Sequence, residues 1–258
     1  MPSKSERTMY QELYTRASTA EQVLGELGYK VYIGAPHSDQ YGVLKQKSDA
    51  SKGIEWKGQE NYDFVAEALM KYIQERMVTE KGLREVRIPE DKDTPINHRD
   101  GPKSDIYMSP DFLPDFKGPV KDSALILIQG TGSVRAGVWA RSVCLNENLE
   151  KGSMLPLIDA AQRNNMSVLV MNPNLRVDPI SRAPIKFCST MESHSSFVWE
   201  KYVLPSKFKK LYVIAHSAGG MCLSAIQKKF ANDFYTRVQK MALTDSYATP
   251  LSQLSKEQ

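Results

Sequence analysis

Four short runs of apolar residues in the second half of the chain set the expected architecture. None of them has a polar face, which is typical of strands that are buried on both sides in a parallel sheet. Helical patterns lie between these runs, so strands alternate with helices. This alternation predicts an α/β fold with a mainly parallel sheet and helices on both faces. The runs are Ser123–Ile128, Val168–Met171, Leu211–Ala215 and Met241–Thr244, and the helical stretches are Met154–Arg163, Ser193–Val203 and Gly219–Ala231.

The first half of the chain follows a less regular pattern. Residues 1–25 are a polar lead-in with room for one short helix. Alternation and β-branched residues predict a strand at Tyr29–Ile33, and residues 34–58 suit a loop or a weak hairpin. From Glu60 to Val78, apolar residues recur at helical spacing. Two short strands are expected at Val86–Ile88 and Ile106–Met108.

Composition narrows the class of protein. With 258 residues and 41% hydrophobic residues, we expect a lead-in over residues 1–25 and a single domain over residues 26–258. The net charge of +4 is too small to indicate nucleic-acid binding. The three cysteines are far apart and odd in number, which suits a reducing compartment and neither a zinc site nor a disulfide framework. No apolar run approaches the roughly 20 residues of a membrane helix.

The segment Ala215–Gly220, with the sequence AHSAGG, joins the third apolar run to the next helix. Small residues stand two positions before and two positions after Ser217, and they let the chain turn sharply from a strand into a helix. Such a turn raises a hydroxyl above the carboxyl edge of the sheet and aims the positive end of the helix at it. The segment departs from the usual G-x-S-x-G pattern because Ala215 replaces the first glycine.

Ser217 is therefore a candidate nucleophile, although the pattern also fits an inert elbow or a serine that only caps the helix. In the hydrolase fold, the oxyanion hole takes one backbone N–H from the loop after an earlier strand and one from the residue after the nucleophile. Gly130, Thr131 and Gly132, together with Ala218, stand at those positions. The alternative is a glycine turn that only connects strand to helix.

Asp245 directly follows the last apolar run, where a carboxylate could orient a catalytic histidine. The flanking threonine and serine make a turn residue the alternative. All four histidines precede Ser217, whereas this fold normally places its base after the nucleophile. We expect His216 to be a packing residue and His194 to be a helix cap or a surface residue. The other two, in polar loops, are His37 and His98.

Several longer motifs resemble one family. They are Gly130–Arg141 followed by Asn146–Leu149, Met171–Asn174, Val198-Trp199, Ala215–Gly220 and Ala242–Ser246. In this order, over about Leu27 to Tyr247, they resemble the Argonaute-binding-protein-two (Arb-two) domain family, which includes the animal cotranscriptional regulators. The stretch from Arg135 to Arg141 is specific, whereas the elbow alone is not.

The resemblance implies an α/β-hydrolase-like fold and a role in the nucleus, with the cytoplasm as a second location. It implies Argonaute partners in small-RNA-directed heterochromatin silencing and, in animals, in alternative splicing. Chromatin and splicing proteins are then further partners, and small RNA is a candidate ligand. The family is suspected of hydrolase activity with the elbow serine as nucleophile, and that role carries over to Ser217. No cofactor, metal or membrane association is implied.

This sequence departs from the family in two places. Gln129 stands where relatives often have histidine, and the late histidine of the family has no counterpart. The chain thus resembles a shortened member, in which we expect the last strands of the sheet to be missing. Arg135 and Arg141 are expected to pair with acidic neighbours and Trp139 to fill the core, in preference to contacting RNA.

Two hypotheses of function remain open. The first is a non-enzymatic interaction protein that uses a hydrolase-like scaffold to bind Argonaute or chromatin partners. The second is a serine esterase or related acyl hydrolase that uses Ser217. A further alternative is that the chain does not fold stably, because an open sheet edge invites aggregation.

Overall fold

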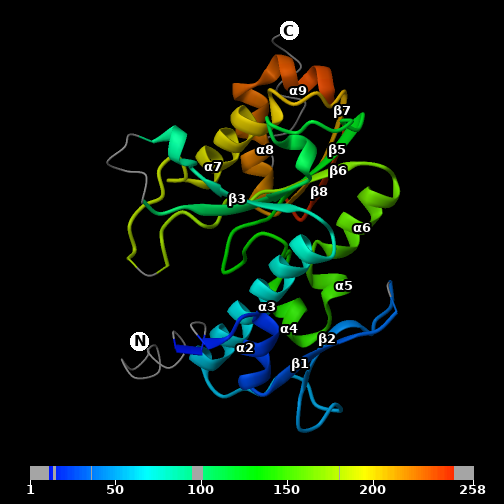
Figure 1. Ribbon diagram of the computed structural model, residues 1–258, viewed down its shortest axis with the longest axis vertical. Helices are drawn as coiled ribbons and strands as arrows, with labels where there is room; N and C mark the ends of the chain where they lie inside the picture. The colour runs from blue at the N-terminus through cyan, green and yellow to red at the C-terminus, as the bar shows by residue number, and fades with distance from the viewer. Residues whose placement is uncertain (1–11, 14–15, 36, 95–100, 180, 247–258) are drawn as a thin grey trace. The chain divides into compact units, whose positions relative to one another are not determined.

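The computed structural model describes residues 12–13, 16–35, 37–94, 101–179 and 181–246 (Figure 1). The chain divides into two compact units, one from residues 1–81 and 137–157 and the other from residues 82–136 and 158–258. One boundary between the units falls inside helix α6, Leu155–Arg163. The predicted boundary between residues 25 and 26 stays a prediction.

The first unit combines an antiparallel hairpin with helices. Its elements are α2 (Ala20–Glu26), β1 (Tyr29–Ile33), β2 (Tyr41–Gln46), α3 (Gln59–Thr79), α4 (Arg141–Asn146) and α5 (Leu149–Gly152). The strand predicted at Tyr29–Ile33 is confirmed. Residues 34–58 were predicted to form a loop or a weak hairpin, and they contribute one strand, β2, which pairs antiparallel with β1. Helix α3 agrees with the predicted helix to within one residue at each end.

Helix α3 forms because its apolar residues recur every three or four positions and gather on one side. These residues are fully buried, and among them are Val65, Leu69, Ile73 and Met77. Strand β2 lies close to α5, because a Cβ atom added to Gly42 would come within 2.5 Å of the Leu149 side chain. The first unit therefore has its own apolar core.

The second unit is built on a six-stranded sheet. The strands are β3 (Arg84–Ile88), β4 (Ser104–Met108), β5 (Ser123–Ile128), β6 (Ser167–Val170), β7 (Lys210–His216) and β8 (Val238–Thr244). Their order is β3-β4-β6-β5-β7-β8. The four predicted apolar runs are all parallel to one another, whereas β4 is antiparallel to both β3 and β6. This mixed but mostly parallel sheet confirms the predicted α/β class.

Helices and strands alternate through this unit. After β6 come α7 (Met191–Val198) and a π-helical turn, η4 (Trp199–Val203), and after β7 come α8 (Gly219–Lys229) and α9 (Ala231–Arg237); the short 3-10 helices are η1 (Asp91–Asp93) and η3 (Pro110–Phe112). On one face of the sheet, Ile126, Val213 and Ala215 belong to the same core cluster as Trp199 and Ile226 from the helices. The alternate strand residues, such as Leu127 and Val170, are also buried, so both faces of the sheet are covered.

Strand β8 departs from the prediction. Its apolar run was expected to be buried on both sides, but β8 lies at the end of the described sheet and most of its residues are exposed. Leu243 is 42% exposed. An apolar run predicts a strand, yet whether a neighbouring strand covers it depends on the topology, which the run does not encode. The helix predicted at Ser193–Val203 begins two residues earlier, as α7, and ends in the π-helical turn η4.

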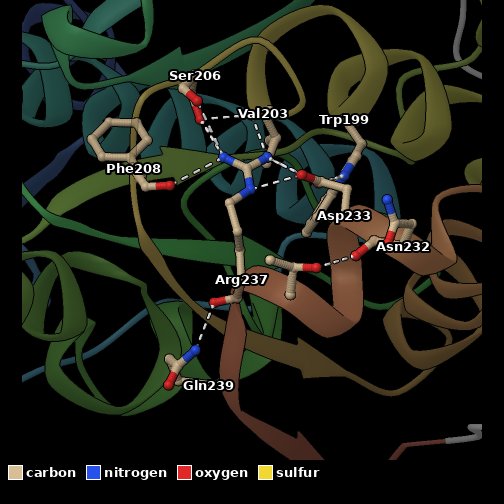
Figure 2. Close-up of polar contacts among 9 residues, drawn as sticks. Trp199, Val203, Ser206, Phe208, Asn232, Asp233, Arg237 and Gln239 are labelled. Atoms are coloured by element: carbon tan, nitrogen blue, oxygen red, sulfur yellow. Dashed lines mark hydrogen bonds and ion pairs between the residues drawn. The ribbon is translucent and has the colours of Figure 1, made fainter.

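A partly buried ion pair fixes the end of α9 (Figure 2). The Arg237 guanidinium donates Nε and Nη2 hydrogen bonds of 2.7 and 2.9 Å to the two carboxylate oxygens of Asp233. Its remaining N–H groups donate to the carbonyls of Val203, Ser206 and Phe208. The indole of Trp199 donates to the same carboxylate at 3.0 Å. One arginine therefore joins the end of η4, the start of β7 and the start of β8.

Replacement of Arg237 by methionine is expected to destabilise the second unit by about 3–5 kcal/mol, because it leaves the mostly buried Asp233 carboxylate without its cation. Urea unfolding of the purified chain measures the loss. The matched control is Lys209→Met, whose partner Asp122 is exposed, and it should change stability by less than about 1 kcal/mol. Equal losses in the two variants would contradict the structural role of Arg237.

Candidate functional site

Ser217 lies on a tight bend between β7 and α8. Its backbone φ is 51°, a left-handed conformation that residues other than glycine rarely adopt. The Ser217 N–H donates to the Thr244 carbonyl at 2.9 Å, and its carbonyl accepts from Gly220 N–H at 3.1 Å. The N-cap residue of α8 is Ala218 and no side chain caps the helix, so Ser217 is not a capping residue. The strained bend is the geometry of a nucleophile elbow.

The glycines around this bend permit an unusually close approach of two backbones. A Cβ atom on Gly130 would lie 2.7 Å from the Cβ atom of Ser217 and 3.2 Å from its hydroxyl oxygen. A Cβ atom on Gly219 would lie 2.7 Å from the carbonyl oxygen of Ile128. The loop that follows β5 is therefore held directly against the elbow. Of the predicted oxyanion residues, Gly130 touches Ser217, Ala218 follows it, and Thr131 and Gly132 are exposed.

Two asparagines hold this loop in place. Gln129 Nε2 and the Ala136 N–H both donate to Asn172 Oδ1, at 3.1 and 3.0 Å. Asn172 Nδ2 donates in turn to the Asp105 carbonyl, and Asn174 Nδ2 donates to the Gly130 carbonyl at 2.6 Å. The two ends of the loop are thus tied to the residues that follow β6. The sequence showed Met171–Asn174 only as a family motif, although an asparagine directly after a buried strand could have indicated this role.

His194 does not lie where the sequence pattern predicts. It was expected to be a cap or a surface residue, but it is fully buried within α7, where Thr190 is the N-cap. Its Nε2 accepts a 3.1 Å hydrogen bond from the Asn172 N–H, so the ring is neutral with its proton on Nδ1. Burial lowers the pKa of His194 to about 3. This histidine binds the backbone of Asn172, whose side chain holds the loop, and its acceptor nitrogen is not available for a proton from Ser217.

Asp245 lies beside the elbow without completing a catalytic triad. The turn that holds it is joined to Ser217 at both ends, since Ser246 Oγ also donates to the Ser217 carbonyl at 2.8 Å. Asp245 is exposed, and its φ is 46°. Nδ1 of His216 lies 3.1 Å from Thr244 Oγ1. Among the described residues, no imidazole contacts the Ser217 hydroxyl or the Asp245 carboxylate, and His98 lies outside them.

The remaining candidates have ordinary structural surroundings. In the first unit, Arg141 pairs with Asp63 at 2.7 Å, which confirms the expected acidic partner, and His37 lies 3.0 Å from Glu150. All three cysteines are free and buried, and burial raises the pKa of Cys144 to about 12. Within the ranges that the structure describes, no three His, Cys, Asp or Glu side chains lie close enough to hold a metal ion. None of the helices in those ranges combines the length and hydropathy of a bilayer-spanning segment.

The second unit has a mostly parallel sheet, on which a strained serine bend joins a strand to a helix and a glycine loop lies beside the bend. These features define an α/β-hydrolase-like protein. Comparison with known proteins points to one family, because residues 54–177 match the model described as the Arb2 domain. This match, together with the relatives described below, confirms the resemblance to the Arb2-domain family that the sequence motifs predicted.

The relatives are longer than this chain. It is 36% identical over 227 residues to a FAM172 family protein homolog of Caenorhabditis elegans, a match that covers 86% of this chain and 64% of the relative. It is 27% identical to the cotranscriptional regulator ARB2A of Homo sapiens, with 73% of this chain and 55% of the relative covered. Among solved structures, the histone deacetylase Clr3 matches 69% of this chain and 26% of its own, at 13% identity and a TM-score of 0.41.

Replacement of Gly219 by alanine is expected to destabilise the chain by about 1–3 kcal/mol, because the added methyl group meets the backbone of β5. Thermal or urea unfolding measures the loss. Gly53→Ala is the control, since nothing lies within 4 Å of its added Cβ atom, and it should stay within about 0.5 kcal/mol of the parent chain. Unchanged stability in Gly219→Ala would show that the elbow does not press on β5.

The buried His194 predicts a pH dependence of stability. Its pKa of about 3 lies below the ordinary value of 6.5. Between these two pH values, His194 is therefore protonated in the unfolded chain and neutral in the folded chain. As the pH falls from 6.5, His194 should cost up to about 1.4 kcal/mol of stability per pH unit. His194→Gln keeps an acceptor for the Asn172 N–H and does not titrate. Urea midpoints of the two chains should therefore diverge on acidification, and parallel curves would refute the assignment.

Proposed function

We propose that this chain is a nuclear regulator that acts during transcription by binding other proteins, and that it is not an enzyme in this form. The proposal rests on one observation. The chain forms the tight bend at Ser217, but none of the histidines in the described residues reaches the Ser217 hydroxyl. A serine without a general base is a weak nucleophile at neutral pH. The human relative is named a cotranscriptional regulator, which favours the same kind of role here.

The finer features of this proposal follow from the family resemblance. Argonaute is the first partner, and chromatin and splicing proteins are further partners. Small RNA is a candidate ligand, and heterochromatin silencing and alternative splicing are the processes in which the chain would act. The nucleus is the principal location, with the cytoplasm as a second one. The modest net charge of +4 favours protein contacts over an extended RNA surface.

A serine acyl hydrolase is the second candidate. Its specific support is the left-handed Ser217, with Gly130 pressed against it and α8 beginning two residues later. In such a reaction, Ser217 Oγ would attack an acyl carbonyl, and the N–H groups of Ala218 and of the 130–132 loop would bind the oxyanion. The serine proton would pass to a histidine oriented by Asp245, a place that none of the described histidines occupies.

A fluorophosphonate probe separates the two candidates. The folded chain should show no labelling above that of Ser217→Ala, because the hydroxyl is not activated. Tagged chain and Ser217→Ala should retain Argonaute equally on co-purification from nuclear extract. Ser51→Ala, in which an exposed hydroxyl is removed, is the control for both assays. Labelling that disappears only in Ser217→Ala would establish the hydrolase, and absence of Argonaute from the folded chain would refute the proposed partner.

A further inference from the structure

A second concave site lies in the second unit, away from the elbow. It is a cavity of about 570 Å³ between α7, the π-helical turn η4, the loop that holds Phe187 and the last turn of α8. Lys229, which lines it, ends α8, whereas Ser217 precedes the first residue of that helix. Eleven helical residues span about 16 Å, so the two sites are separate. π-helical turns recur at functional sites, and here η4 supplies part of the wall.

Phe187 has a left-handed backbone conformation, which is unfavourable for a residue other than glycine. The Cys188 N–H donates to the Ile185 carbonyl at 3.0 Å, which makes Phe187 the third residue of a tight turn with a φ of 65°. Glycine is the usual residue at that position of a type II turn. Ile185 and Cys188 are buried on either side, whereas Phe187 is 39% exposed. The loop is therefore anchored so that a strained aromatic ring faces the cavity, a pattern that favours a role in binding over one in folding.

The aromatic wall offers ring edges to a ligand. The rings of Phe187 and Phe197 are stacked, with centroids 4.8 Å apart and planes 6° from parallel. The ammonium of Lys186 lies over the first ring at 4.9 Å, and that of Lys201 lies over the second at 5.7 Å. Because the faces are covered, the electropositive edges are what remains for contact. Such edges prefer the face of another aromatic ring, in the T-shaped arrangement.

The charged residues that line the cavity balance one another, and one further cation lies beside them. The carboxylate of Asp93 pairs with Lys201, which also pairs with Glu90 at 3.0 Å, and that of Glu200 pairs with Lys229 at 2.7 Å. Lys186 is not part of the lining, but its ammonium lies over the ring of Phe187, which is. In the described part of the chain, Lys186 has no carboxylate partner. The hydroxyl of Ser196 on the cavity wall likewise has no hydrogen-bond partner there. The site therefore complements a ligand with an aromatic group, a nearby negative charge and a hydrogen-bond acceptor.

We infer that this cavity binds a short acidic peptide segment of a protein partner, with an aromatic side chain as the anchor. The anchor lies against the edges of Phe187 and Phe197, an acidic residue beside it pairs with Lys186, and Ser196 donates to the peptide backbone. A cavity of about 570 Å³ accommodates one large side chain with its neighbours. The inference deepens the proposed function, on which it rests, by giving the regulator a site for a protein partner.

Selection from a phage-displayed library of random twelve-residue peptides tests the site on the purified full chain. We expect enriched sequences to share an aromatic residue with aspartate or glutamate within two positions. Synthetic peptides are then measured by fluorescence polarisation. Phe187→Gly should weaken binding by about tenfold or more, because it removes an anchor contact. The rim substitution Lys186→Gln should weaken it by roughly two- to fivefold, and more at low salt.

Two comparisons separate binding from folding. Glycine suits the left-handed φ of residue 187, so Phe187→Gly should unfold at nearly the same temperature as the parent chain while it loses the peptide. Leu204→Ala removes another exposed apolar side chain of the same unit, and its peptide affinity should be unchanged. Failure to enrich any sequence, enrichment of basic sequences, or equal affinity of Phe187→Gly would overturn the inference. If one of these outcomes is found and Argonaute co-purifies with Phe187→Gly as well as with the parent chain, the inference fails and the proposed function still stands.

Discussion

The contact between the elbow and the end of β5 is the constraint on which the second unit depends. Two backbones approach so closely at Gly130 and Gly219 that no side chain fits between them. The left-handed Ser217 lies at this contact, where the chain leaves β7 and enters α8. The burial of β5 and β7 side by side in the sheet stabilises the arrangement against that strain. The same packing would be needed whether the serine reacts or only shapes a scaffold.

A cluster of buried polar groups around Asn172 supports this arrangement. Asn172 is almost fully buried, and it binds Gln129, Ala136, Asp105 and His194 through its side chain and backbone. Most polar atoms of this cluster are paired, which favours a single geometry, whereas Gln129 Oε1 and His194 Nδ1 are buried without a hydrogen-bond partner in the described part of the chain. The loop beside Ser217 is therefore held by side chains from the next strand and helix. A hydrolase-like shape can be retained in this way without the proton-transfer chemistry that the fold often carries.

Most of the sheet could be predicted from the sequence because buried strands are continuous apolar runs, as in Ser123–Ile128. The sequence also predicted that Ser217 lies on the bend, because small residues on both sides of a serine allow a sharp turn between a strand and a helix. It misjudged His194 because position along a helix does not reveal which side faces the core. The cavity at Phe187 was not predicted, because its residues come from segments that are far apart in the chain. Proximity of that kind is set by tertiary packing.

Strand β8 is one of the two edge strands of the described sheet, and polar contacts fix both of its ends. Arg237, with its guanidinium on Asp233, directly precedes it, and the carbonyl of Thr244 at its far end accepts the N–H of Ser217. Its seven residues span about 23 Å. The Arg237–Asp233 ion pair at the start of β8 and the Ser217 bend at its end are therefore anchored to the same edge strand. The register of this one strand fixes where both of them lie along the sheet.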